Sequence, residues 1–245
     1  HDFVIFLTDA GKCYLKRVYE IPVGSRASRG RHVNNFIGVD PEEESLASIL
    51  ALETLETQDA FLLTCSRKGK VKRSALSDYA NIRANGLIAV QIEEEDQLLA
   101  ARLVRAEDEV IIGTAAGMSI RFSVADVRPM GRDTRGVRGI ELRDDDFVVG
   151  MDVVEDDEQQ VLAVSANGYG KRTPIGEWRL QGRGGKGIIA MVTSERNGDL
   201  VKIRLVRPGE QIMVVTNGGQ VIRTHIDQIR EAVRSTQGVR IIRVA

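Results

Sequence analysis

Apolar and polar positions follow a pattern that recurs five times along the chain. Each occurrence begins with a run of apolar and β-branched residues and ends in a polar turn with a glycine. The runs read FVIFLTDAG, FLLTCSRKG, VIIGTAAG, VLAVSANG and IMVVTNGG, and their closing glycines are Gly11, Gly69, Gly117, Gly168 and Gly219. These first glycines are 58, 48, 51 and 51 residues apart, a spacing that is typical of a repeated structural unit.

A second glycine follows each first glycine, in a loop of polar and basic residues. The second glycines are Gly30, Gly86, Gly136, Gly187 and Gly238, and the offset between the two glycines is 19 residues in four repeats and 17 in the second. We therefore predict a single domain over residues 1–245, with repeats at about 1–57, 58–106, 107–157, 158–207 and 208–245.

Each repeat is predicted to consist of strands. Apolar runs of this length, bounded by turn residues such as Asn167-Gly168, are typical of tight hairpins. A third strand is expected after the second glycine, then an acidic turn and a fourth strand such as DFVVGMDVV. About four strands in each unit of some 50 residues predict an all-β, propeller-like fold. Ser45–Thr54 fits either a strand or a short helix, and the fifth repeat stops before its fourth strand. Strands that close the propeller are therefore expected outside this chain, as in a piece of a longer protein.

The amino-acid composition excludes few classes of function. The net charge is −1, so the chain as a whole exerts no basic field that would attract nucleic acid. Cys13 and Cys65 lack metal-ligand spacing and are predicted to be buried free thiols in a reducing compartment. The sequence has neither a signal-peptide pattern nor a bilayer-length apolar run, which favours a cytoplasmic protein without a membrane partner.

The cations are sorted by their position in the repeat. Four residues before the second glycine stand Arg26, Arg132, Arg183 and Arg234, and the same loops carry Arg29, Arg83, Arg135 and Lys186. A second set follows the first glycine and consists of Arg73, Arg121, Lys171, Arg172 and Arg223. Acidic residues gather in the turns beside the fourth strand, as at Asp144–Asp146. Equivalent positions lie at equivalent places in a repeat fold, so we expect a basic track apart from an acidic one.

Glycine beside arginine lets a backbone N–H and a guanidinium reach the same phosphate. The first set is therefore predicted to contact nucleic-acid phosphates. The second set is a weaker candidate, because arginines on strands can instead pair with acids of a neighbouring blade. The alternative for any single arginine is a solvated ion pair of little energetic value.

The segment Gln181–Gly187, which we call the glycine-rich loop, places four glycines and two cations in its last six positions. A nucleotide-binding P-loop requires glycine where Leu180 stands and a hydroxyl residue where Gly187 stands, followed by a helix. Nucleotide hydrolysis is therefore not expected here. The alternatives are a loop for nucleic-acid phosphates or a tight turn without a ligand.

The glycine-rich loop resembles the signature Gln-Arg-Arg-Gly-Gly-Lys-Gly of the DNA gyrase A subunit. It matches six of seven positions and departs at Gly182; Gln181, Arg183, Gly184, Gly185, Lys186 and Gly187 agree. The segments SRASRGRHV, RPMGRDTRGVRGI, SANGYGKRT and RSTQGVRII are similar to successive blades of the C-terminal domain of that family. The family's main signature normally precedes the first blade, upstream of His1, so the loop resembles a second, variant copy. Topoisomerase IV is the related alternative.

This resemblance implies a β-pinwheel of about six four-stranded blades that binds, bends and chirally wraps duplex DNA without sequence preference. Wrapping would enable ATP-dependent negative supercoiling by a heterotetramer built from gyrase A and gyrase B subunits. The catalytic tyrosine and the ATP site, with its Mg²⁺, would lie outside this chain. We therefore expect neither catalytic residues nor a metal or cofactor here, a monomeric isolated domain, and a nucleoid-associated location in the cytoplasm.

Two other classes of function remain. A protein-binding propeller would use the charged tracks as partner surfaces, although Trp178 is followed by Arg179 rather than completing a Trp-Asp signature. An enzyme with its site in a propeller channel would need an acid–base or metal cluster, and His1, His32 and His225 form no such pattern.

Overall fold

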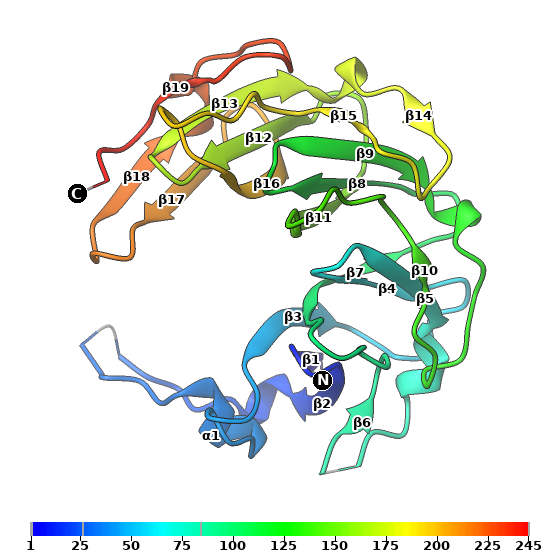
Figure 1. Ribbon diagram of the computed structural model, residues 1–245. Helices are drawn as coiled ribbons and strands as arrows, with labels where there is room; N and C mark the ends of the chain where they lie inside the picture. The colour runs from blue at the N-terminus through cyan, green and yellow to red at the C-terminus, as the bar shows by residue number, and fades with distance from the viewer. Residues whose placement is uncertain (1, 26, 84, 245) are drawn as a thin grey trace. The chain divides into compact units, whose positions relative to one another are not determined.

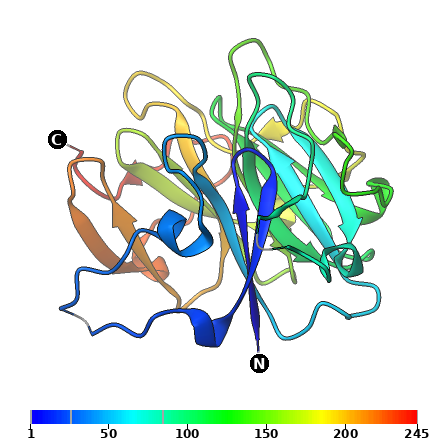
Figure 2. The same ribbon diagram turned by 90° about the horizontal axis from the view of Figure 1, so that it is seen from below.

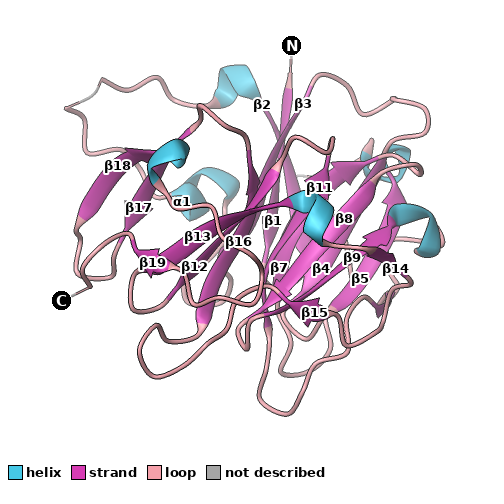
Figure 3. Ribbon diagram, turned by 90° about the horizontal axis from the view of Figure 1, so that it is seen from above, coloured by secondary structure: helices cyan, strands magenta, loops and turns pink. Residues whose placement is uncertain are grey.

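The computed structural model describes residues 2–25, 27–83 and 85–244 and is built almost entirely of β-strands (Figures 1 and 3). The α-helix in these ranges is α1 (Val33–Ile37), and short 3₁₀ turns occur at Val18–Glu20, Leu76–Tyr79, Val124–Asp126, Ile175–Glu177 and Ile226–Gln228. None of the described helices is long or apolar enough to cross a lipid bilayer. The all-β fold class predicted from the sequence is confirmed.

The strands form successive small sheets whose members are mostly antiparallel. The first sheet has the order β3 (Leu46–Leu52), β1 (Phe3–Thr8), β2 (Lys12–Arg17), β6 (Leu87–Ile88). The second has the order β10 (Val137–Arg138), β5 (Lys70–Ala75), β4 (Phe61–Ser66), β7 (Leu98–Val104). The third has the order β11 (Val148–Val154), β8 (Glu109–Thr114), β9 (Met118–Ser123), β14 (Leu180–Gln181), and β15 (Ile188–Ile189) also pairs with β9. The fourth has the order β16 (Leu200–Val206), β12 (Gln160–Ser165), β13 (Tyr169–Pro174), β19 (Val239–Arg240), and β17 (Gln211–Val215) pairs with β18 (Val221–His225).

The third strand of a repeat does not join the sheet of its own repeat. It is only two residues long and pairs with the second strand of the preceding repeat, as β6 does with β2, β15 with β9 and β19 with β13. The sequence predicted a longer strand and did not indicate this exchange. The segment that fitted either a strand or a helix forms β3.

The first glycine anchors this exchange in the first, third and fourth repeats. Gly117 has a φ of +80°, a conformation that glycine adopts at little cost, and its carbonyl accepts hydrogen bonds from the N–H groups of Ala190 and Met191. The carbonyls of Gly11 and Gly168 accept equivalent pairs of hydrogen bonds from the next repeat. The recurrence of these glycines therefore reflects a backbone connection between repeats as well as a hairpin turn.

The chain divides into two compact units, 1–106 with 127–137 and 107–126 with 138–245. In the first unit, a core around Ile5, Leu62 and Leu76 is completely or almost completely buried. The loop between the first 3₁₀ turn and α1 contains no regular secondary structure in its described residues (Figure 2). Both cysteines are buried and free, as predicted, and burial raises the pKa of the Cys13 thiol to about 12.

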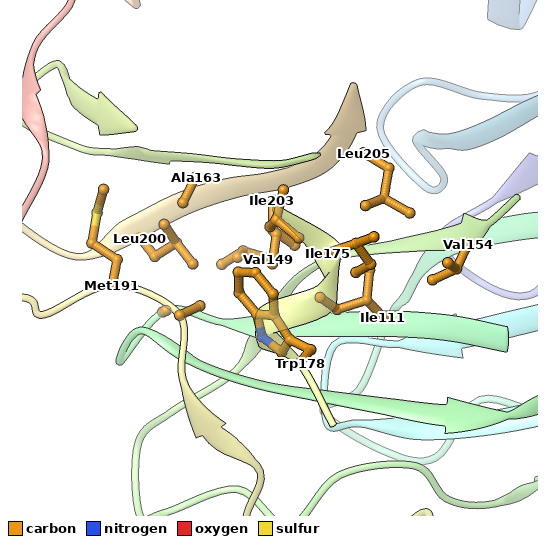
Figure 4. Packing of buried hydrophobic residues seen from close by; sticks show 13 residues of the cluster. Ile111, Val149, Val154, Ala163, Ile175, Trp178, Met191, Leu200, Ile203 and Leu205 are labelled. Carbon is orange, nitrogen blue, oxygen red and sulfur yellow. The ribbon is translucent and has the colours of Figure 1, made fainter. Parts of the chain in front are cut away.

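The core of the second unit surrounds Trp178, the only tryptophan of the chain (Figure 4). Its indole ring is buried, and its Nε1–H donates to Ser119 Oγ at 2.6 Å. Ile203 of β16 packs against Gly113 of β8 and Gly150 of β11, where a Cβ would lie 2.7 Å from Ile203 atoms. These glycines let neighbouring sheets of this unit approach closely.

Candidate nucleic-acid interface

The second glycines of the second to fifth repeats bring their loops into direct contact with the sheet of the preceding repeat. Gly136, Gly187 and Gly238 all have positive φ angles. A Cβ would lie 2.5 Å from Val71 O at Gly136 and 2.6 Å from Gly170 O at Gly238, and it would overlap Ser119 O at Gly187. Glycine is therefore required at these three positions, and the cations beside it are held at a fixed place on the sheet.

The glycine-rich loop is fixed to the second unit by its own backbone. The N–H of Gly184 donates to Gly139 O at 2.6 Å, and Gly185 O accepts from the N–H of Glu141 at 2.9 Å. A Cβ at Gly182, the position that differs from the gyrase signature, would meet no atom within 4 Å. The side chain of Lys186 is exposed. The loop is thus a docked structure with one cation directed to the solvent.

The side chains of Arg183 and Arg234 donate hydrogen bonds to backbone carbonyls of the protein itself, which the sequence did not indicate. Arg183 donates from Nη1 to Arg138 O at 3.0 Å, and Arg234 donates from Nη1 to Ile189 O at 3.0 Å. Both carbonyls belong to the second residue after a second glycine. Each arginine therefore clamps its own loop to the short third strand of the preceding repeat.

The Nε groups of the two arginines have different surroundings, and that of Arg234 makes no hydrogen bond to the residues that the structure describes. Arg183 Nε donates to Asp126 O at 2.8 Å, whereas Arg234 Nε lies 3.7 Å from Glu177 Oε2 and its guanidinium lies 5.9 Å from the Trp178 ring centroid. Only part of each guanidinium is left for an external ligand.

The remaining members of the first set lie mainly at the surface of the first unit. Arg29 and Arg83 are exposed, and Arg132 is half-buried. Arg135 is exposed and lies 3.7 Å from Glu93 Oε1, a weak partial ion pair. Arg26 lies outside the described residues.

Most members of the second set are held inside the protein. Arg121 Nε donates to Glu109 Oε2 at 2.6 Å, and its Nη1 donates to the carbonyls of Ile175 and Trp178. Arg172 Nε donates to Ile229 O at 2.8 Å, with Asp227 and Glu231 within 3.9 Å of Nη1. The contacts of Arg172 match the expected pairing with acids of a neighbouring blade, whereas Arg121 pairs with Glu109 of its own repeat.

The other two arginines of the second set differ from each other. Arg73 is buried, its guanidinium lies 4.7 Å from the Phe61 ring centroid, and desolvation lowers its pKa. Arg223, on β18, is exposed. Of the second set, only Arg223 is therefore accessible to an external ligand.

Two buried lysines hold basic loops in place. Lys72 and Lys171 each stand three residues after a first glycine and are 1% and 0% exposed. Lys72 Nζ donates to the carbonyls of Ala89 and Arg132, and Lys171 Nζ donates to the carbonyls of Val233 and Arg234. Burial lowers the pKa of both ammonium groups to about 8.

Sequence reasoning assigned Lys171 to an external ligand and missed Lys72. The signal that could have linked the two is their shared position after the first glycine. Lysine is rarely fully buried, so the residue type itself favoured a surface role. Among the described residues, no cluster of three potential metal ligands is present.

Known proteins are similar to this chain in both sequence and fold. The family model for the DNA gyrase C-terminal domain, beta-propeller, matches residues 2–53, 60–105, 108–155, 159–207 and 210–245. The DNA gyrase A subunit of Staphylococcus epidermidis is 43% identical over the whole chain, and that of Staphylococcus aureus is 44% identical. The chain spans 27–28% of the length of these relatives.

Two solved structures have closely similar backbones. A DNA gyrase A C-terminal domain has a TM-score of 0.86 at 26% identity, covering 100% of this chain and 79% of that one. A topoisomerase IV C-terminal domain has a TM-score of 0.90 at 20% identity, covering 99% of this chain and 75% of that one, and at this identity it supports the fold alone. The repeated sheets, the docked glycine loops and the match along the full length lead to one conclusion: this chain belongs to the family of DNA gyrase A C-terminal domains, a β-propeller family of the type II topoisomerases.

Proposed function

We propose that this chain binds duplex DNA without sequence preference, bends it and wraps it with a fixed handedness. The observation that carries the proposal is the recurrent docking of basic loops through a glycine and a buried or clamping cation. Backbone N–H groups and guanidiniums placed at one phase of a repeat provide phosphate contacts that carry no sequence information.

Repetition is required by the energetics of bending. With a persistence length of about 150 base pairs, bending about 30 base pairs through half a turn costs on the order of 15 kcal/mol. A single loop cannot offset this free energy, whereas phosphate contacts from several repeats, each releasing counterions, can do so together.

Within this proposal, the contacts to DNA come from the exposed and half-exposed cations of the basic loops. They are Arg29, Arg83, Arg132, Arg135, Lys186 and the outward N–H groups of Arg183 and Arg234, together with the exposed Arg223 of β18. Arg26, which lies outside the described residues, is included because of its position in the repeat. Arg73, Arg121, Lys171 and Arg172 are excluded because their side chains are engaged inside the protein.

The chain would act as the wrapping module of a DNA gyrase. The remainder of the gyrase A polypeptide would supply the cutting tyrosine, and the gyrase B polypeptide would bind ATP and Mg²⁺, within a heterotetramer located with the nucleoid in the cytoplasm. The relatives that support this assignment are bacterial gyrase A subunits.

The test is to bind the chain to relaxed circular plasmid at two salt concentrations, treat it with a nicking-closing enzyme, and separate the topoisomers on a gel. We expect a salt-sensitive shift in linking number. Binding without a shift would contradict chiral wrapping, and absence of binding at low salt would favour a protein-binding propeller.

Two variants locate the contacts. A Lys186→Gln, Arg135→Gln double variant removes exposed cations without disturbing a clamp, and should reduce both the linking-number shift and the salt slope. Arg207→Gln is a matched control, because Arg207 is already paired with Glu155 and Asp156. An unchanged salt slope in the double variant would show that these loops do not face DNA.

A further inference from the structure

A pair of arginines outside the glycine loops converges on one tyrosine in the second unit. Tyr169 follows the first glycine Gly168, and its ring is largely buried. Arg240 is its cross-strand neighbour on β19 and donates from Nη2 to Tyr169 Oη at 2.9 Å. Arg196 comes from the turn before β16, and both guanidinium carbons lie 5.2 Å from the centroid of the Tyr169 ring.

The turn that carries Arg196 is rigid. Asn197 is fully buried, and its side-chain oxygen accepts from the N–H of Ser194 at 2.8 Å while its amide nitrogen donates to Val192 O at 2.8 Å. Asn167 Nδ2 donates to Arg196 O at 3.2 Å. The backbone of Arg196 is therefore held before any ligand arrives.

Arg196 is basic, whereas the residues at the equivalent position of the second and third repeats are acidic. Asn197 stands ten residues after a second glycine, where the second and third repeats have Asp96 and Asp146, whose carboxylates also accept backbone hydrogen bonds of the turn. The preceding residue is Glu95 in the second repeat, Asp145 in the third and Arg196 in the fourth. The position that carries an acid in the second and third repeats thus carries a cation here, beside Glu195.

The two arginines share a neutral partner instead of a carboxylate. In the described parts of the chain, neither Arg196 nor Arg240 has a carboxylate oxygen within 4.0 Å, whereas Arg207 and Arg121 both do. The two guanidiniums also lower the pKa of Tyr169 by hydrogen bonding to its hydroxyl. Two cations held together without an acid gain free energy when an anion joins them.

We propose that Arg196 and Arg240, positioned by Tyr169, bind a phosphate of the DNA backbone. This site is separate from the glycine loops and rests on the proposed DNA-binding function. A phosphodiester fits because its anionic oxygens accept from two planar guanidiniums at once, and because the basic loops of the same chain are proposed above to contact other phosphates of the DNA backbone. Free phosphate shares this chemistry and is distinguished by the test.

The experiment measures DNA affinity of the 245-residue chain at several salt concentrations. For an Arg196→Gln, Arg240→Gln double variant, we expect the slope of log K against log salt to fall by about 0.9 for each phosphate that is no longer neutralised. Arg207→Gln should leave the slope unchanged. Tyr169→Phe keeps the ring and removes the hydroxyl, so it should weaken binding less than the double variant.

The outcomes separate this site from the function on which it rests. An unchanged slope in the double variant, with a lower slope in the Lys186→Gln, Arg135→Gln variant, would overturn the site and retain DNA binding. Unchanged slopes in both would overturn both. Should the double variant unfold, Arg196→Gln alone decides the matter, because Arg196 is an exposed turn residue. Titration with inorganic phosphate, followed by NMR of the arginine side chains, forms the second arm, and saturation by phosphate together with an unchanged DNA slope would assign the site to a free anion and refute our proposal.

Discussion

Three glycines of the glycine-rich loop allow backbone strain and steric overlap to be measured separately at one place. At Gly187 the φ is +70° and a Cβ would overlap Ser119 O. At Gly184 the φ is +80°, but the nearest atom to a Cβ would be Arg138 O at 3.4 Å. At Gly182 the surrounding space is open.

The expected losses of stability follow from these differences. A left-handed conformation costs an alanine about 1–2 kcal/mol, so Gly184→Ala should lower the free energy of unfolding by this amount. Gly187→Ala adds an overlap worth about 1–3 kcal/mol, for a total of roughly 2–5 kcal/mol. Gly182→Ala should be neutral, or stabilising by up to about 1 kcal/mol through the unfolded state.

Trp178 provides the assay, because this only tryptophan is buried beside the loop and its Nε1–H donates to Ser119, the residue that Gly187 contacts. Urea and thermal unfolding followed by its fluorescence should rank the variants Gly182→Ala, Gly184→Ala and Gly187→Ala in order of decreasing stability. Each kcal/mol corresponds to a shift of about 2–4 °C in the midpoint. If Gly187→Ala were as stable as Gly182→Ala, the docking of the loop on Ser119 would be refuted.

Two further predictions concern buried cations. Arg121→Gln should lower the free energy of unfolding by about 2–4 kcal/mol, because it leaves Glu109 and two carbonyls without their donor. The salt slope of DNA binding should stay constant in this variant. A lower slope in a variant that is still folded would instead place Arg121 at the DNA. Lys72 and Lys171 have native pKa values of about 8 against an ordinary value of 10.5, so the unfolded state binds more protons between these values and the free energy of unfolding should rise as the pH increases from about 8 to 10.5. Urea unfolding across this range, with a Lys72→Met, Lys171→Met variant as control, should show a flatter dependence in the variant, and equal slopes would contradict the assignment.

The repeat and the hairpins could be predicted because they depend on local chemistry. Apolar runs ending in a glycine such as Gly168 specify strands and a turn within about ten residues of sequence. The phase of the arginines before the second glycine was also visible. These features do not depend on contacts with residues that are distant in the sequence.

The features that the sequence analysis did not predict depend on contacts between residues far apart in the chain. The third strand is two residues long and pairs with a strand about 70 residues earlier, as Ile189 does with Met118. The N–H groups of Ala190 and Met191 fix this pairing by donating to the carbonyl of Gly117. Lys72 resembles a surface lysine until the carbonyls around it are known. The sequence analysis assigned Arg183 to phosphate contacts alone. Its fork-shaped guanidinium also donates hydrogen bonds to Asp126 O and Arg138 O.

The exchange of the third strand means that the unit of sequence and the unit of folding do not coincide. A sheet is complete only when the following repeat has been added, so a segment cut at the boundaries of the sequence repeat would lack one strand and carry another without a partner. A contiguous segment that holds one complete sheet must extend from the first strand of one repeat to the third strand of the next, and it then also contains a third strand and a hairpin that belong to neighbouring sheets.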